Sequence, residues 1–108
     1  MVIAKFTMRA SDEQFIGFDV SGHADYADEG EDIVCAGVSS AVMLTANTIT
    51  ECYKSNAKVF AGDGSIKLEL ERDCNDRGVL MSMQGLHMHL GFLSEDFPGA
   101  VTVSVKKV

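Results

Sequence analysis

The chain of 108 residues contains one proline, no tryptophan and three cysteines. With so little proline and no low-complexity stretch, the sequence argues against a disordered chain or a flexible linker. The cysteines, Cys35, Cys52 and Cys74, are odd in number, lie far apart and form no C-x-x-C pair. Neither a disulfide framework nor a zinc cluster is therefore indicated, and we expect free thiols, as in a reducing compartment.

Basic residues are also few, because nine Lys and Arg stand against 16 Asp and Glu, for a formal net charge of −7. This charge argues against direct binding of nucleic acid and favours a basic partner or substrate. No apolar run approaches the length of a membrane span, and the first residues lack the basic and apolar regions of a signal peptide. The composition predicts a cytoplasmic protein with no membrane partner.

The length suits one domain, residues 1–108, with a core of two layers. Alternating apolar residues predict strands over 2–10, 14–21, 65–72 and 100–105, with a shorter strand at 58–61. Apolar residues at helical spacing predict helices over 33–53 and 79–93. The order β-β-α-β-β-α-β predicts an α+β fold, with a mainly antiparallel sheet and two helices packed on one face.

The start of the first predicted helix carries a candidate nucleophile. Asp32 suits the N-cap position, and Ile33 begins the apolar pattern. Cys35 then falls in the first turn, where unpaired N–H groups and the helix dipole stabilise a thiolate, the reactive form of cysteine. Polar residues are sparse along this helix, so we expect the rest of the protein to cover it well.

A histidine is available to work with this cysteine. His23 follows the second strand, and the eight residues of 24–31 return the chain to the helix. An imidazole beside the thiol could shuttle protons. Five of the eight positions of 25–32 are carboxylates, which would favour the neutral thiol if they pointed inward. We expect most of them to face water, where they could attract a basic peptide.

The same residues have plainer interpretations. A cysteine on an apolar helix is more often a buried small hydrophobe, and an acidic run is usually a solvated loop. Ser39, one turn after Cys35, either contacts the site or bonds the Cys35 carbonyl. His87 and His89 are expected to be structural or exposed. A metal site of His23, Cys35 and a carboxylate would have unusual spacing, so no metal or other cofactor is expected.

The motif around both residues resembles that of a known family. Gly22-His23-Ala24, an acidic gap and Asp32-Ile33-Val34-Cys35-Ala36-Gly37-Val38-Ser39 are similar to the signature of the ribosomal-processing cysteine proteases, called Prp. The resemblance implies a Cys-His endopeptidase, with Cys35 as nucleophile and His23 as base. It implies removal of a short N-terminal extension from a large-subunit bacterial ribosomal protein.

The resemblance also implies a homodimer and a mobile substrate-binding loop that orders when substrate binds. This loop consists of Ala24, Asp25, Tyr26, Ala27, Asp28, Glu29, Gly30 and Glu31. Asp32, Ser39 and Ala36 match the motif as supporting residues. Asp32 is a candidate to orient His23, and the backbone N–H groups of Cys35 and Ala36 could hold an oxyanion. The alternative is a non-catalytic ribosome-assembly module that docks a basic ribosomal protein through its acidic loop.

Overall fold

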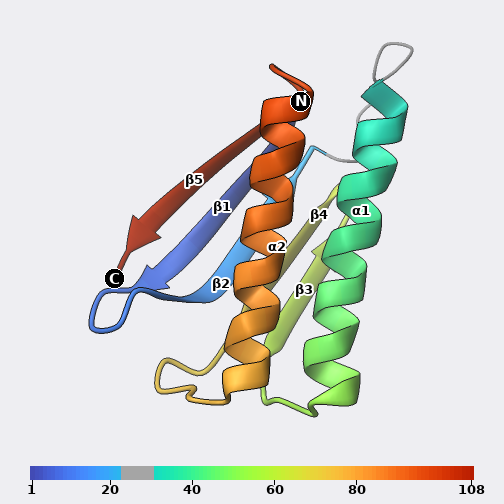
Figure 1. Cartoon of the computed structure of the whole chain (residues 1–108). Coiled ribbons are helices and arrows are strands. Elements are labelled where there is room, and N and C mark those ends of the chain that lie inside the picture. The colour runs from blue at the N-terminus through green and yellow to red at the C-terminus, as the bar shows by residue number, and fades with distance from the viewer. Residues whose placement is uncertain (23–30) are drawn as a thin grey trace.

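The computed structural model describes residues 1–22 and 31–108. Two helices cover one face of a five-stranded sheet (Figure 1). The strands are β1 (Val2–Arg9), β2 (Gln14–Ser21), β3 (Lys58–Gly62), β4 (Ser65–Glu69) and β5 (Val101–Lys107). The helices are α1 (Glu31–Asn47), its π-helical continuation η1 (Thr48–Cys52) and α2 (Arg77–Asp96). The predicted α+β fold and element order, including the short strand β3, are confirmed.

The sheet has the strand order β3-β4-β2-β1-β5, and its neighbours are antiparallel except β1 and β5, which run parallel. The register sets Phe6 opposite Phe18, and Phe18 opposite Leu68. Side chains directly opposite each other share a face of a sheet, and these three are at most 2% exposed. A row of side chains across three central strands therefore forms the base of the core.

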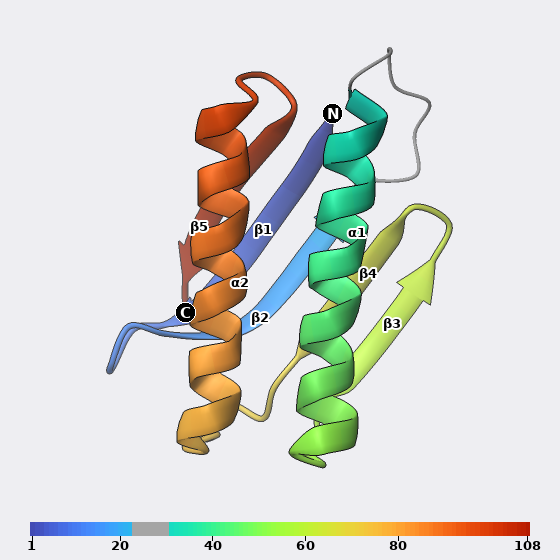
Figure 2. The same ribbon diagram turned by 45° about the vertical axis from the view of Figure 1, so that its right-hand side comes forward.

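The helices lie side by side and run in opposite directions over this face (Figures 1 and 2). The residues that they bury recur at helical spacing: Val34, Val38, Val42 and Ala46 on α1, and Val79, Leu80, Met83, Leu86 and Leu90 on α2. Fully burying one such side chain stabilises the fold by about 1.5–3 kcal/mol before entropy is counted. The two apolar stripes hold both helices against the sheet.

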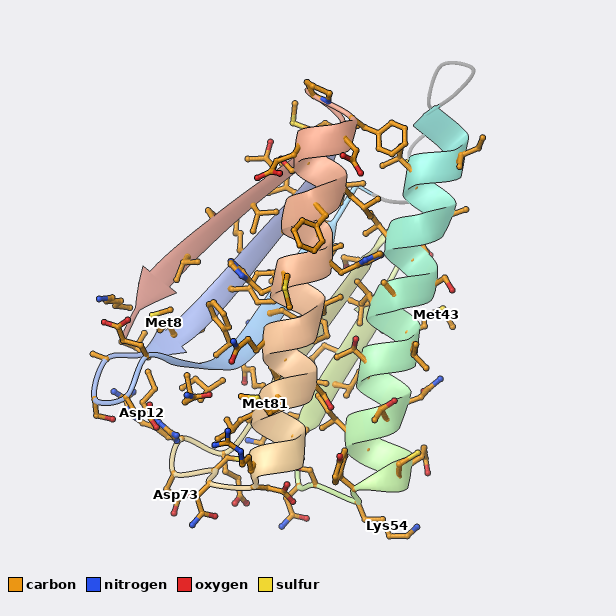
Figure 3. The ribbon with its side chains drawn as sticks, in the orientation of Figure 1. Met8, Asp12, Met43, Lys54, Asp73 and Met81 are labelled. Carbon is orange, nitrogen blue, oxygen red and sulfur yellow. The ribbon has the colours of Figure 1, made fainter. Side chains whose placement is uncertain are left out.

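The outer side of α1 is more open than its sequence predicts. Ile33, Met43 and Leu44 are 74%, 54% and 68% exposed, so the expectation that this helix is well covered is wrong. Figure 3 shows Met43 on the side of α1 turned away from α2. The physical reason is the two-layer architecture, because a sheet on one side leaves the opposite side of the helix to solvent.

The expectation that no apolar segment is long enough to span a membrane is also wrong. Ile33–Cys52 is 20 residues long with a mean hydropathy of 1.5, which is enough by length and composition alone to cross a membrane. The core helix of a soluble protein passes the same test. Here Val34, Val38 and Val42 pack into the core beside the sheet, which gives the apolar composition of this helix a structural reason.

The ends of α1 differ from the prediction. The helix begins at Glu31, so Asp32 lies inside it and is not the N-cap. Carboxylates are favourable both at the cap and in the first turn, so composition does not separate these positions. Beyond Asn47 the helix widens into η1, where Thr48 donates to the Leu44 carbonyl at 2.7 Å. Such back-bonding competes with the helical ladder.

The helix α2 is longer than predicted at both ends. It begins at Arg77 because the Asp76 side chain caps it, accepting from the N–H groups of Gly78 at 3.0 Å and Val79 at 3.3 Å. It ends at Asp96 instead of residue 93. The three glycines inside the observed helix, Gly78, Gly85 and Gly91, do not shorten it, because the buried stripe holds the helix to the sheet.

Arg9 fastens the end of the molecule opposite the start of α1. Its guanidinium donates to Asp12 Oδ2 at 2.7 Å and to the carbonyls of Arg72 and Cys74 at 2.8 Å each. Figure 3 shows Asp12 and Asp73 at this end. The expected polar turn between β1 and β2 is thereby linked to the loop before α2, far from the residues of the predicted site.

Candidate active site

Cys35 is the fifth residue of α1 and is half-buried, with its side chain packed against the core. Successive residues of an α-helix advance by about 100°, so Cys35 lies roughly 200° around the axis from Gly37. Gly37 lines the groove between α1 and α2. Cys35 is therefore on the flank of α1 that faces away from α2. All three cysteines are free thiols, as expected.

The observed helix start changes what the backbone can offer at this site. A helix leaves its first four N–H groups without helical partners. Because α1 begins at Glu31, the N–H groups of Cys35 and Ala36 come after these four. The expectation that these two groups are free to hold an oxyanion is therefore not supported.

His23 and the loop residues 24–30 lie outside the described residues, and so do the side chains of Glu31 and Asp32. The predicted proximity of Cys35 and His23 therefore stays a prediction. The structure does describe Ser39, which is half-buried four residues after Cys35, and Ala36, which is exposed. Because residues four apart share a helix face, Ser39 lies on the same flank as Cys35.

Gly22 is the last described residue before His23, and its backbone is tightly constrained. Its φ is +85°, a conformation that residues with a Cβ rarely adopt. A Cβ at this position would also collide with the Met1 carbonyl oxygen. The Gly22 N–H donates to the Gly64 carbonyl at 3.0 Å, in the turn between β3 and β4. Gly22, the residue before His23, is therefore held against the β3–β4 turn and lies close to Met1.

A groove of about 540 Å³ between the two helices was not predicted. Its lining residues are Gly37, Ser40, Ala41, Leu44, Thr45 and Thr48 on α1, with Ser82, Gly85, Leu86 and His89 on α2. Cys35 does not line it. A signal was present in the sequence, because Gly37 and Gly85 are mid-helix residues that weaken a helix by up to about 1 kcal/mol each relative to alanine.

The two histidines of α2 have the structural or exposed positions that were expected. His87 stacks on Phe15 with ring centroids 4.3 Å apart and meets Phe6 edge-on at 5.0 Å. Burial lowers the pKa of His87, because an apolar setting disfavours the charged imidazolium. His89 is exposed and lines the groove. Neither residue lies on the Cys35 flank of α1.

Relatives of known structure share this fold along the whole chain. The crystal structure of SMU.848 from Streptococcus mutans matches with a TM-score of 0.88 and 25% identity, over 100% of this chain and 99% of that chain. The ribosomal processing protease Prp from S. aureus, crystallised with a substrate peptide, matches with a TM-score of 0.89 and 21% identity, over 98% and 100%. At 21% identity, the similarity to the S. aureus protease shows a shared fold.

Sequence comparison identifies the family. The ribosomal processing cysteine protease Prp of Bacillus subtilis (strain 168) is 39% identical over 41 residues. That match spans 38% of this chain and 37% of the length of the relative. The family model of cysteine protease Prp matches residues 1–102, which is nearly the whole chain and includes the Gly22 to Ser39 motif. On this match, the chain belongs to the cysteine protease Prp family.

Proposed function

We propose that this protein is the cysteine endopeptidase that removes the N-terminal extension of a large-subunit bacterial ribosomal protein during ribosome assembly. The observation that carries the proposal is the family match over residues 1–102, with its motif cysteine half-buried near the start of α1. A related Prp from S. aureus has been crystallised with a substrate peptide and with a covalently linked product peptide. Such structures are what a protease with a covalent intermediate would yield.

In the proposed reaction, Cys35 is the nucleophile and His23 the general acid and base. His23 first takes the proton of the Cys35 thiol. The Cys35 Sγ attacks the scissile carbonyl carbon, and the tetrahedral oxyanion collapses as the C–N bond breaks. His23 gives its proton to the leaving amine, and the remaining acyl group stays on Cys35 as a thioester. His23 then takes a proton from water, which attacks the thioester and releases the new carboxyl end and free Cys35.

Supporting roles are proposed for three further parts of the motif. Asp32 lies inside the first turn of α1 and is proposed to orient His23. Ser39 shares the Cys35 flank and is proposed to contact the site. The loop of residues 24–31 is proposed to order over the bound peptide, with its carboxylates attracting basic residues of the substrate.

Replacing the proposed nucleophile tests the activity. We expect Cys35→Ala to slow cleavage of the extended ribosomal protein by roughly 10⁴-fold or more, because the thioester can no longer form. Cys52→Ala is the matched control, since Cys52 is exposed in η1 at the opposite end of the helix, and it should cleave at the native rate. The shortened product is measured by mass spectrometry over time.

Other results would support different functions. Tight binding of the ribosomal protein without cleavage by the native chain would contradict the protease and favour the non-catalytic binding module. Among residues 1–22 and 31–108, no three His, Cys, Asp or Glu side chains gather so that they could hold a metal ion. His23 is not among these residues, so elemental analysis tests the metal alternative, and stoichiometric zinc would support it.

We propose that the protein is a homodimer that pairs through the outer surface of its two helices. This outer helix surface contains Ile33, Met43, Leu44, Met88 and Phe92, all more than half exposed. Exposed apolar patches mark interaction surfaces. A twofold dimer joins the same patch on two copies, and here one patch offers both bulky side chains and a groove lined by glycines.

We further propose that the protein works in the cytoplasm, on a protein substrate, without direct contact with nucleic acid or membrane. Three free thiols suit a reducing compartment. The net charge of −7 opposes phosphate groups and favours basic ribosomal proteins.

A further inference from the structure

The edge strand β3 has an unprotected surface. Among the described residues it pairs with β4 alone, and all five of its residues are exposed. Val59 and Phe60 are 42% and 54% exposed. They point to opposite faces of the sheet, since their partners are Leu68 and Lys67. Natural edge strands are usually protected by charges, prolines or bulges. Within β3, Lys58 is the one charged residue, and there is no proline.

The free side of β3 carries main-chain groups that can bond a further strand. The β3–β4 hairpin closes on Gly62 and Ser65, with two residues between them. Hydrogen-bonded and non-bonded pairs alternate away from such a turn. The N–H and C=O groups of Val59 and Ala61 therefore point away from β4. An extended peptide could pair with both residues while placing alternate side chains against Val59 or Phe60.

This edge leads towards the proposed catalytic residues. The β3–β4 turn and the start of α1 lie at the same end of the molecule in both views (Figures 1 and 2). Within the turn, the Gly64 carbonyl accepts the N–H of Gly22, the residue before His23. Cys35 lies on the flank of α1 away from α2. Both helices are on the same face of the sheet, and α2 lies towards the β1 and β5 edge, away from β3 (Figure 2).

We propose that β3 receives the N-terminal extension of the substrate as an added strand, paired with Val59 and Ala61, which presents the scissile bond to Cys35. The inference rests on the proposed protease function. A second copy of the chain is the rival occupant of this edge. A five-residue strand offers little area towards the roughly 1,000 Å² that a stable protein interface needs, whereas a peptide also held at the catalytic site needs less.

Amide hydrogen exchange tests the pairing directly. The Cys35→Ala protein, labelled with ¹⁵N, is saturated with a synthetic peptide that spans the extension and the cleavage point. We expect exchange of the Val59 and Ala61 amides to slow by about tenfold or more, because strand pairing protects them. The amides of β5, the opposite edge, are the control and should not change. Unchanged exchange at β3 with the peptide bound would overturn the inference.

A variant tests the same pairing by activity. Ala61→Pro removes one outward N–H group without removing a bond to β4, and we expect kcat/KM to fall roughly three- to tenfold. Ser104→Ala, an exposed position on the opposite edge strand β5, is the control and should cleave at the native rate. If Ala61→Pro does not fold, peptides N-methylated at single positions replace it, and losses at every second position are expected.

The outcomes separate the two proposals. A native chain that cleaves nothing contradicts the protease, and with it this inference. A native chain that cleaves normally, with no protection of β3 and no effect of the N-methyl groups, overturns only the strand addition. Protection of Val59 and Ala61 that rises with protein concentration, in the absence of peptide, assigns the edge to a second copy and also overturns it.

Discussion

Gly22 and Gly37 belong to the same motif, yet their surroundings differ. Gly22 has a positive φ and touches the Met1 carbonyl, so a side chain there would be strained and would collide with backbone. Gly37 lies inside α1, and a Cβ added to it would meet nothing within 4 Å. Of these two motif glycines, only Gly22 is required by the fold of one chain. Gly37 instead keeps the groove open.

A pair of alanine variants tests this difference. We expect Gly22→Ala to lower the free energy of unfolding by about 1–3 kcal/mol, the usual range for a strained backbone position. It should also lower kcat, since His23 follows directly. Gly37→Ala should leave stability unchanged or raise it by about 0.5–1 kcal/mol. Urea unfolding measures both, and equal effects of the two substitutions would contradict the assignment.

His87 makes the stability of the fold depend on pH. Burial lowers its pKa in the folded protein below the ordinary value of 6.5, so the unfolded chain binds the proton more readily. The stabilising contribution is complete above pH 6.5 and is lost as the pH falls through the folded pKa. Unfolding at pH 7 and pH 5 should show a smaller difference for His87→Leu than for the native chain. The exposed His89→Leu should keep the native difference.

At the scale of elements, the helices are positioned by different means. The start of α2 is fixed by a side-chain cap, since Asp76 accepts from the N–H groups of Gly78 and Val79. The α-helical part of α1 instead gives way to the π-helical η1, where threonines bond carbonyls four residues back. Both devices are short-range, and both lie far from Cys35.

The cap of α2 can be tested separately from the rest of the helix. Asp76→Ala should cost about 1 kcal/mol of stability, since two N–H groups lose their acceptor. Asp73→Ala is the control, because Asp73 is an exposed acidic residue of the same loop that does not cap the helix. Thermal unfolding of both variants measures the difference. A loss as large for Asp73→Ala would show that charge, and not capping, is responsible.

At the scale of the molecule, the sheet is covered on one face and the helices are open on the other. The open face of the sheet carries polar residues such as Lys5, Asp19 and Lys67, which the register places side by side. The outer helix surface is instead apolar. The two exposed faces therefore differ in chemistry, and the helix surface is the one suited to pairing.

The proposed dimer follows from this contrast. We expect Leu44→Glu to convert the protein to a monomer, because a charge would be buried in the interface without a partner. Ser104→Glu, at an exposed position of β5, is the control and should stay dimeric. Sedimentation equilibrium over a range of concentrations measures both. A native protein that is monomeric throughout would contradict the dimer, without bearing on the protease.

Much of the fold could be predicted because its signals are local. The alternation of Ile66, Leu68 and Leu70 predicts β4, although the strand itself ends at Glu69. The helix boundaries are harder to predict: the sequence favours Asp32 as a cap and does not single out Asp76, although both precede apolar runs. Capping depends on which N–H groups are near a carboxylate, and this depends on where the chain enters the helix.

Within the candidate site, Cys35 at the start of a helix follows from the sequence, because helix periodicity and the motif both fall within a few residues. The flank of α1 on which Cys35 lies, and the groove on its other side, come from the packing of two helices separated by about thirty residues of chain. The same is true of His87, which is lodged against Phe6 and Phe15, and of His89, which lines the groove.

The sequence by itself therefore determined the types and order of the elements, the family, and the two residues proposed for catalysis. Only the tertiary structure decided which side of α1 is covered, which glycine is required, and which strand is left as an unprotected edge. The physical reason is the distance along the chain over which each effect acts. Propensity and periodicity act within one or two turns, whereas burial depends on what a distant part of the chain brings to the same place.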